Sequence, residues 1–328
     1  MLERLQSGRA AGVVLFARNL GTPDEIDRLT RSILTVSPKL PPVISIDQEG
    51  GRVQRVKAPF PHWPPMARLG ERGDEKLTEE VGRAFGREVA ALGFNVDFAP
   101  VLDVHTNPQN PIIGDRAFGT EPKSATAQAL AFWRGLESAG VRGCGKHFPG
   151  HGDTATDSHL ELPIVRKSER ELREIELPPF VAAAKAKVPM IMTAHVVYPS
   201  VDEKPATLSS RWLTDILRKE IGFDGVIVSD DFDMKALAGR WPVEETIVQS
   251  LLAGADAFLL CRDPEVQARA EAALESAAAK DAKVRARVEE SAARLERFRR
   301  SLVVPPPAGE WRALPLDAHQ SLADRFRV

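Results

Sequence analysis

Residues 146–159 read KHFPGHGDTATDSH and combine three histidines, two aspartates and a lysine without helical or strand periodicity. Pro149 fixes φ and Gly150 permits turns that other residues avoid, so the chain is expected to bend sharply here. Asp157 and His159 lie two positions apart and can meet only in an extended or turning segment. A carboxylate beside an imidazole holds one tautomer and raises the imidazole pKa, which suits a proton donor near neutral pH. We therefore predict that Asp157 and His159 form an acid/base dyad.

The same histidines allow a metal site as an alternative. His147 and His151 are four positions apart, and His159 or Asp157 could complete a zinc-like set of ligands. Ligation by two histidines four apart normally needs a helix, and the Pro-Gly pair between them argues against one. For His151, which lies between two glycines, we favour a structural role as a hydrogen-bonding group.

A second candidate is the aspartate pair in GVIVSDDFDM, residues 225–234. Strand alternation puts Val226, Val228 and Asp230 on one face, so a carboxylate follows two core valines at the end of the strand. This position predicts a catalytic carboxylate. Aspartates also cap helices well, and one member of the pair could cap the helix that follows while the other faces a pocket.

Further charged residues lie in two loops, SIDQEGGRVQR at 45–55 and IIGDRAFG at 112–119. Carboxylates accept hydrogen bonds from sugar hydroxyls, whereas arginine and lysine donate to hydroxyl or amide oxygens. The residues concerned are Asp47, Glu49, Arg52, Arg55, Asp115 and Arg116. For Glu49, Arg52 and Asp115 we favour a structural salt bridge between loops over ligand binding. The Gly-Gly pair is not a dinucleotide fingerprint, because the spacing G-x-G-x-x-G is missing.

Strand-like and helix-like segments alternate along the chain, and the polar motifs follow the strands. This order predicts parallel βα units and an eight-stranded parallel barrel, whose active site is built at the carboxyl ends of the strands. Only seven convincing strands are present, and MLERLQSGR at the start reads as helix. We therefore expect an imperfect barrel or residues missing upstream. The strands are predicted at 12–16, 42–46, 94–98, 141–146, 188–193, 225–229 and 255–260.

Composition favours a cytoplasmic globular protein. The chain has 328 residues, 43% of them hydrophobic and 27% charged, with a net charge of -2 and two cysteines. Interspersed charges give no basic stripe for nucleic acid, and no apolar run is long enough for a bilayer. Cys144 and Cys261 are expected to be buried free thiols in a reducing compartment. We expect a monomer, with a barrel over 1–302 and a Pro-interrupted tail over 303–328 packed on its exterior.

Six motifs, in chain order, resemble the β-N-acetylglucosaminidases of glycoside hydrolase family 3, which act in bacterial cell-wall recycling. They are GVVLFARN, IDQEGGRVQR, NVDFAPVLDV, KHFPGHGDTATDSH, MTAHV and GVIVSDDFDM. The resemblance spans about residues 12–260, and the K-H-F-P-G-H-G, D-S-H and S-D-D combination is its most specific part. It implies a single (β/α)8 barrel that removes terminal N-acetylglucosamine with retention of configuration through a covalent intermediate, without a cofactor.

The resemblance also assigns roles to individual residues. Asp230 corresponds to the nucleophile, His159 to the general acid/base and Asp157 to its partner. A histidine thus replaces the second carboxyl group that most retaining glycosidases use. The implied sugar-binding residues are Asp47, Arg55, Arg116, Lys146 and His147. The implied substrate is a small saccharide or muropeptide.

One departure from the family and two other functions remain open at this point. Family members usually carry a strand segment before the GVVLFARN motif, and this chain begins too late to supply it, in agreement with the seven strands counted. A metal-dependent hydrolase using His147, His151 and His159 is the main alternative. A sugar-binding barrel without catalysis is the other, but the presence of both Asp230 and His159 argues against it.

Overall fold

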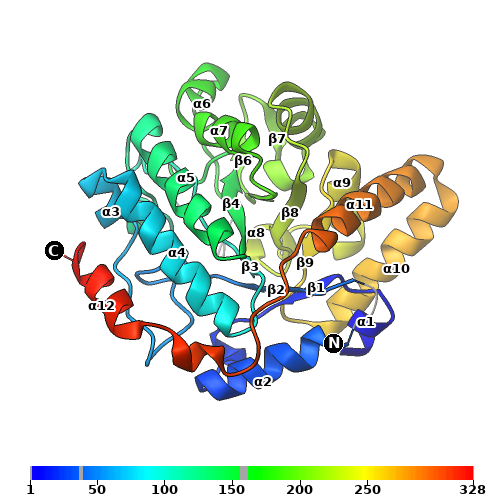
Figure 1. Ribbon diagram of the computed structural model, residues 1–328. Coiled ribbons are helices and arrows are strands. Elements are labelled where there is room, and N and C mark those ends of the chain that lie inside the picture. Colours follow the sequence, from blue (N-terminus) through cyan, green and yellow to red (C-terminus); the bar gives the residue numbers. More distant parts are fainter. Residues whose placement is uncertain (1, 37–39, 156–161, 328) are drawn as a thin grey trace.

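A computed structural model describes residues 2–36, 40–155 and 162–327. Its centre is a curled parallel sheet of seven strands in the order β1-β2-β3-β4-β5-β8-β9 (Figure 1). Each predicted strand segment overlaps one of them, and within the described residues the ladder stops at β1 and β9. Their bounds are β1 Gly12–Val14, β2 Val43–Ile46, β3 Val96–Asp97, β4 Arg142–Phe148, β5 Met190–Thr193, β8 Val226–Asp231 and β9 Ala257–Leu259.

The parallel pairing explains why the strands read as nearly continuous apolar runs. Register pairs such as Ile44 with Val13 and Ile191 with Ile227 place strands side by side in the same direction. Helices cover the outer face while side chains fill the inner face, so residues of both faces are buried. A separate antiparallel hairpin, β6 Val197–Tyr198 and β7 Asp202–Pro205, was not predicted.

The helices surround the sheet, as Figure 1 shows. Helix α2 begins with a capping box in which Thr22 and Glu25 bond each other's backbone N–H groups, and Asp74 caps α4. The segment at 169–186 forms two helices because Leu177 and Pro178 interrupt it. The helices are α1 Leu2–Gln6, α2 Pro23–Leu34, α3 Ala67–Arg72, α4 Glu75–Ala91, α5 Pro122–Ser138, α6 Glu169–Ile175, α7 Pro178–Ala186, the π-helix η4 Arg211–Glu220, α8 Lys235–Ala238, α9 Val243–Ala253, α10 Pro264–Lys280, α11 Ala282–Arg300 and α12 Leu316–Asp324.

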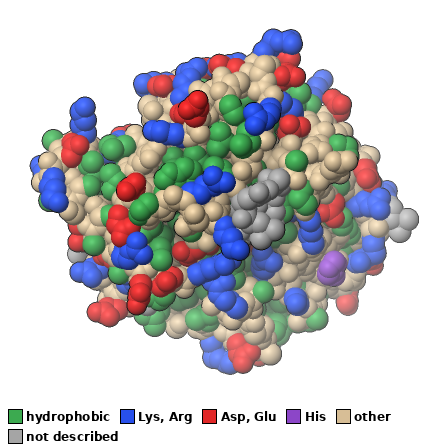
Figure 2. Space-filling model, turned by 180° about the vertical axis from the view of Figure 1, so that it is seen from behind, with side chains coloured by type: hydrophobic (Ala, Val, Ile, Leu, Met, Phe, Trp, Pro, Cys, Tyr) green, Lys and Arg blue, Asp and Glu red, His purple; other side chains and the backbone are tan. Residues whose placement is uncertain are grey.

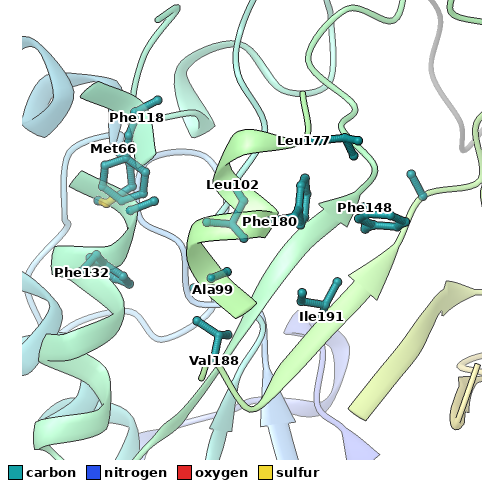
Figure 3. Packing of buried hydrophobic residues seen from close by; sticks show 14 of the residues in the cluster. Met66, Ala99, Leu102, Phe118, Phe132, Phe148, Leu177, Phe180, Val188 and Ile191 are labelled. Carbon is teal, nitrogen blue, oxygen red and sulfur yellow. The ribbon is translucent and has the colours of Figure 1, made fainter. Parts of the chain in front are cut away.

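The largest hydrophobic cluster lies between the sheet and the helices α4, α5 and α7. Figure 3 shows Phe180 of α7 beside Phe148 of β4, and their rings meet edge to face with centroids 5.2 Å apart. Helices α4 and α5 approach closely because Gly82 and Gly135 have no side chain. A Cβ on Gly82 would lie 2.1 Å from the carbonyl oxygen of Phe132. This packing holds β4, which carries the candidate site residues Lys146 and His147.

Residues after Leu302 run back along α4. His319 of α12 lies with Nδ1 2.7 Å from Oε1 of Glu88, and Trp63 donates from Nε1 to the other oxygen of Glu88 at 3.0 Å. All three side chains are buried. Burial raises the pKa of Glu88, although its hydrogen bonds to His319 and Trp63 oppose that effect.

No helix in the described part of the chain has the length and apolar content needed to cross a bilayer. On the face seen in Figure 2, acidic and basic side chains are interspersed, with one compact group of lysine and arginine side chains near its centre. This mixture agrees with the near-neutral net charge of -2.

Candidate active site

A pocket of about 300 Å³ opens where the strands end. Parallel strands bring their carboxyl ends to one edge of a barrel, so residues far apart in sequence converge there. Six of the eight candidate residues from the sequence line this pocket: Asp47, Arg55, Arg116, Lys146, His147 and Asp230. The other two, Asp157 and His159, lie outside the described residues.

Asp230 ends the inward-facing row of β8 and points its carboxylate into the pocket. Burial alone would raise its pKa, but the charges of His195 and His147 and a 2.8 Å hydrogen bond from the backbone N–H of Asp231 together hold the pKa below its ordinary value. The carboxylate is therefore ionised at neutral pH, as a nucleophile must be.

Asp231 has the opposite electrostatic balance. Burial and the neighbouring carboxylates Asp233 and Asp230 raise its pKa to about 6. Its Oδ1 accepts the backbone N–H groups of Asp233 at 3.1 Å and Cys261 at 3.2 Å. Asp231 thus binds the loops that follow β8 and β9 while it also lines the pocket, and it does not cap α8, whose N-cap is Met234. Cys144 is buried as predicted, whereas Cys261 is only partly buried and lines the pocket.

Lys146 joins two carboxylates beneath the pocket. Its Nζ lies 2.7 Å from Asp47 and 2.5 Å from Glu49, although only 2% of the lysine side chain is exposed. Burial opposes the charge, but the two carboxylates raise the pKa of Lys146 above its ordinary value. Arg116 holds the other side of Glu49 through two hydrogen bonds of 2.7 and 2.9 Å. The four side chains form one charge-balanced network.

Glu49 forms structural salt bridges, which is the role that the sequence favoured for it. Burial would raise its pKa, yet the charges of Arg116 and Lys146 lower it far below the ordinary value. Arg52 and Asp115, for which a salt bridge was also favoured, pair with each other at 3.4 Å. Arg55 behaves differently, because its Nε is buried without a hydrogen-bond partner among the described residues and its side chain lines the pocket.

His147 is held from behind by Asp103, which sequence reasoning missed. Nδ1 of His147 lies 2.8 Å from Oδ2 of Asp103, and Oδ1 of Asp103 accepts the backbone N–H groups of His147 and His151. Burial would raise the pKa of Asp103, but the charge and hydrogen bond of His147 lower it. The available signal was a charged residue inside the apolar run VLDV, where an unpaired carboxylate would be costly.

The structural role predicted for His151 agrees with its surroundings. Its Nδ1 lies 2.8 Å from Oγ1 of Thr154, and the ring is buried. Burial and the nearby His147 lower the pKa of His151 to about 4, so the ring is neutral at pH 7. Among residues 2–36, 40–155 and 162–327, no three His, Cys, Asp or Glu side chains are grouped to hold a metal ion, and the predicted ligands Asp157 and His159 are not among them.

The two described ends of the segment that contains Asp157 and His159 are tied together. Nζ of Lys167 lies 3.3 Å from Asp153 and 2.5 Å from the buried Glu176, and it donates to Thr106 at 3.0 Å. Thr106 in turn donates to Asp153 at 3.0 Å. These contacts connect the loop that follows β4 to the loop that precedes α6.

A curled parallel sheet with an ionised carboxylate and a buried charge network at its carboxyl edge is the arrangement of an α/β-barrel enzyme. The family model for the glycosyl hydrolase family 3 N-terminal domain matches residues 2–298. A β-hexosaminidase of Nitrosomonas eutropha is 42% identical over 261 residues, which cover 77% of this chain and 74% of that protein.

Solved structures agree with this match. A family 3 β-N-acetylglucosaminidase from Paenibacillus sp. str. FPU-7 superimposes with a TM-score of 0.92 at 36% identity, over 99% of this chain but only 64% of that protein. NagZ from Neisseria gonorrhoeae, in complex with N-trifluoroacetyl-D-glucosamine, has a TM-score of 0.85 at 33% identity, over 100% of this chain and 94% of that one.

The chain belongs to glycoside hydrolase family 3. The resemblance inferred from the motifs is therefore confirmed, and so is the prediction that the protein is a glycoside hydrolase.

Proposed function

We propose that this protein is a retaining exo-glycosidase that removes terminal β-linked N-acetylglucosamine, with Asp230 as the nucleophile. The observation that supports this most directly is an ionised carboxylate at the end of β8, facing a pocket lined by Lys146, His147 and Arg116. The relatives support the sugar, since the Nitrosomonas relative is a β-hexosaminidase and the Neisseria structure holds an N-acylated glucosamine.

In the first step, one carboxylate oxygen of Asp230 attacks the anomeric carbon while the bond to the leaving oxygen breaks. His159, held by Asp157, gives its proton to that oxygen. In the second step, neutral His159 takes a proton from water, the water oxygen bonds to the anomeric carbon, and the ester bond to Asp230 breaks. Two displacements restore the starting configuration, and the same residue acts first as acid and then as base.

The sugar would be held by residues with complementary hydrogen-bonding capacity. Asp47 accepts from hydroxyl groups, and its charge is balanced by Lys146 at 2.7 Å. Arg55 lines the pocket, and its buried Nε donor has no hydrogen-bond partner among the described residues. Arg116 supplies further donors to hydroxyl or N-acetyl oxygens, and Nε2 of His147 offers a further hydrogen-bonding atom to the sugar. Because their partners already fix these side chains, little rotamer freedom is lost when the sugar binds.

We extend the proposal to substrate and setting on the strength of the family resemblance. The substrate is a fragment derived from peptidoglycan, a small saccharide or a muropeptide, and the enzyme acts in the cytoplasm as a monomer. The sheet belongs to a barrel of the (β/α)8 type whose first strand is absent or irregular. Residues 1–302 form this catalytic barrel, and 303–328 form a tail on its surface.

The decisive experiment is intact-protein mass spectrometry after brief exposure to a 5-fluoro N-acetylglucosaminide, with metal content measured on the same sample. Wild-type protein should gain the mass of one sugar, and Asp230→Asn should not. Asp233→Asn is the matched control, because this nearby carboxylate accepts the backbone N–H groups of Cys261 and Arg262 instead of lining the pocket. Labelling of Asp230→Asn, or an unlabelled wild type whose hydrolysis stops with a chelator, would reject the proposal.

A further inference from the structure

His195 follows β5 and is completely buried. Its Nε2 lies 3.1 Å from the carbonyl oxygen of Asp231, and its Nδ1 lies 2.8 Å from Oγ1 of Thr207. The imidazole therefore spans the space between β5 and the end of β8. Phe232, the residue after Asp231, packs edge to face on the imidazole ring of His195, with ring centroids 5.9 Å apart.

The hydrogen-bond partners determine how the ring is used. A carbonyl oxygen only accepts, so Nε2 of His195 carries a hydrogen and donates it to Asp231. Thr207 is itself fixed, since its Oγ1 donates to the carbonyl oxygen of Ala194 at 3.0 Å and lies 2.7 Å from the hydroxyl of Thr193. The orientation of the imidazole is consequently set by a buried network on its far side.

This network ends at the proposed nucleophile. The backbone of Asp231 accepts from His195 through its carbonyl oxygen and donates to Oδ1 of Asp230 through its N–H at 2.8 Å. Burial raises the pKa of Asp230, and among the charged groups that lower this pKa His195 has the largest effect, ahead of His147 and Lys146 across the pocket. The neighbouring acid is Asp231. A change in His195 would alter both the position of Asp230 and its electrostatic surroundings.

We propose that His195 is a positioning residue for the glycosidase reaction, which aligns Asp230 through the backbone of Asp231 and is itself oriented by Thr207. The inference rests on the proposed function, because it takes Asp230 as the nucleophile. His195 does not line the pocket and was not among the candidate residues of the sequence.

The test compares His195→Ala, His195→Gln and Thr207→Val in hydrolysis of 4-nitrophenyl N-acetyl-β-glucosaminide across pH. We expect His195→Ala to lower kcat/KM about 100-fold, since small misplacements of a reacting group have effects of this size. His195→Gln should recover about tenfold of that loss, because its amide can still donate to Asp231. Thr207→Val should lose about tenfold through a misoriented imidazole. The acidic limb of kcat/KM should move to higher pH in both His195 variants.

The control for a merely structural effect is His319→Gln, a buried histidine bonded to Glu88 and remote from β8. It should lower thermal stability without moving the acidic limb. The inference is overturned if His195→Gln and Thr207→Val keep kcat/KM within about twofold of wild type and leave the acidic limb in place, whether or not His195→Ala folds. Failure of the proposed function looks different, because Asp230→Asn would then still form the fluorosugar adduct.

Discussion

The backbone N–H of Asp231 lies 2.8 Å from Oδ1 of Asp230, so one aspartate of the pair stabilises the charge of the other. Their environments push the two pKa values apart. Asp230 stays below its ordinary value, because the nearby cationic groups outweigh its burial, whereas burial and like charges raise the pKa of Asp231 to about 6. Neighbouring carboxyl groups separated in this way can take different roles at one pH.

The raised pKa of Asp231 predicts a pH-dependent stability. Because the folded state favours the protonated acid, the stabilisation is present below pH 3.8 and is lost as pH rises to about 6. Asp231→Asn keeps the Oδ1 acceptor for Asp233 and Cys261 but cannot ionise. Between pH 4 and pH 7 the wild type should therefore lose on the order of 2 kcal/mol more unfolding free energy than the variant. The measurement is urea unfolding at several pH values. The prediction is wrong if the unfolding free energies of the two proteins change equally between pH 4 and pH 7.

Lys146 should be required for stability as well as for binding. Lys146→Met would leave Asp47 and the buried Glu49 without the cation that lies 2.7 and 2.5 Å from them. Removing one partner of such a buried pair costs about 3–5 kcal/mol. Lys219→Met is the matched control, since its 69% exposed side chain pairs with Asp215 on the surface and should change stability by about 0.5 kcal/mol or less. If the two variants had equal unfolding free energies, Lys146 would not stabilise the fold through Asp47 and Glu49.

Asp103 should matter for activity although it does not line the pocket. Its Oδ2 accepts from Nδ1 of His147, and this contact fixes the tautomer of that ring. Asp103→Asn would present an amide N–H group to that nitrogen and favour the other tautomer, so we expect kcat/KM to fall about 10- to 100-fold.

Asp27→Asn is the control for that variant, because Asp27 is a buried carboxylate that pairs with Arg31 on α2 and does not line the pocket. Kinetics with the 4-nitrophenyl substrate and a thermal melt on each variant separate activity from folding. Retention of wild-type kcat/KM by Asp103→Asn would remove His147 from the proposed sugar-binding set.

The strands were predictable because each reads as an apolar run; the central strands are buried on both faces, whereas β1 and β9 are only partly buried. Strand β4 extends to Phe148, beyond the segment predicted to end at Lys146, because Lys146 and His147 continue the ladder as buried polar residues. A hydrophobic pattern cannot reveal such an extension, because Lys146 and His147 are polar and are paired with residues distant in sequence. The β6–β7 hairpin was missed because DEKP, the sequence of β7, carries no strand-like pattern and exposes Glu203 and Lys204.

The site residues that could be predicted are those whose residue type and sequence motif both indicate a site. The residues that were missed are those whose role depends on a contact with another residue. Asp230 and Lys146 follow strand-like runs and carry chemistry that the position can use. Asp103 and His195 act through other side chains or backbone atoms, and their partners come from different strands. Sequence spacing does not reveal those pairings, because they arise only when the sheet brings the strands together.

The role proposed for His159 can be tested by varying the leaving group, although His159 and Asp157 lie outside the described residues. A good leaving group such as 4-nitrophenolate departs without a proton, whereas a sugar alkoxide needs one. His159→Ala should therefore lower kcat/KM by about 10²–10⁴ for substrates with basic leaving groups and far less for activated ones. A Brønsted plot over a series of aryl glycosides measures this as a steeper slope for the variant. Equal losses across the series would assign His159 to binding or structure, and the proton would have to come from another group.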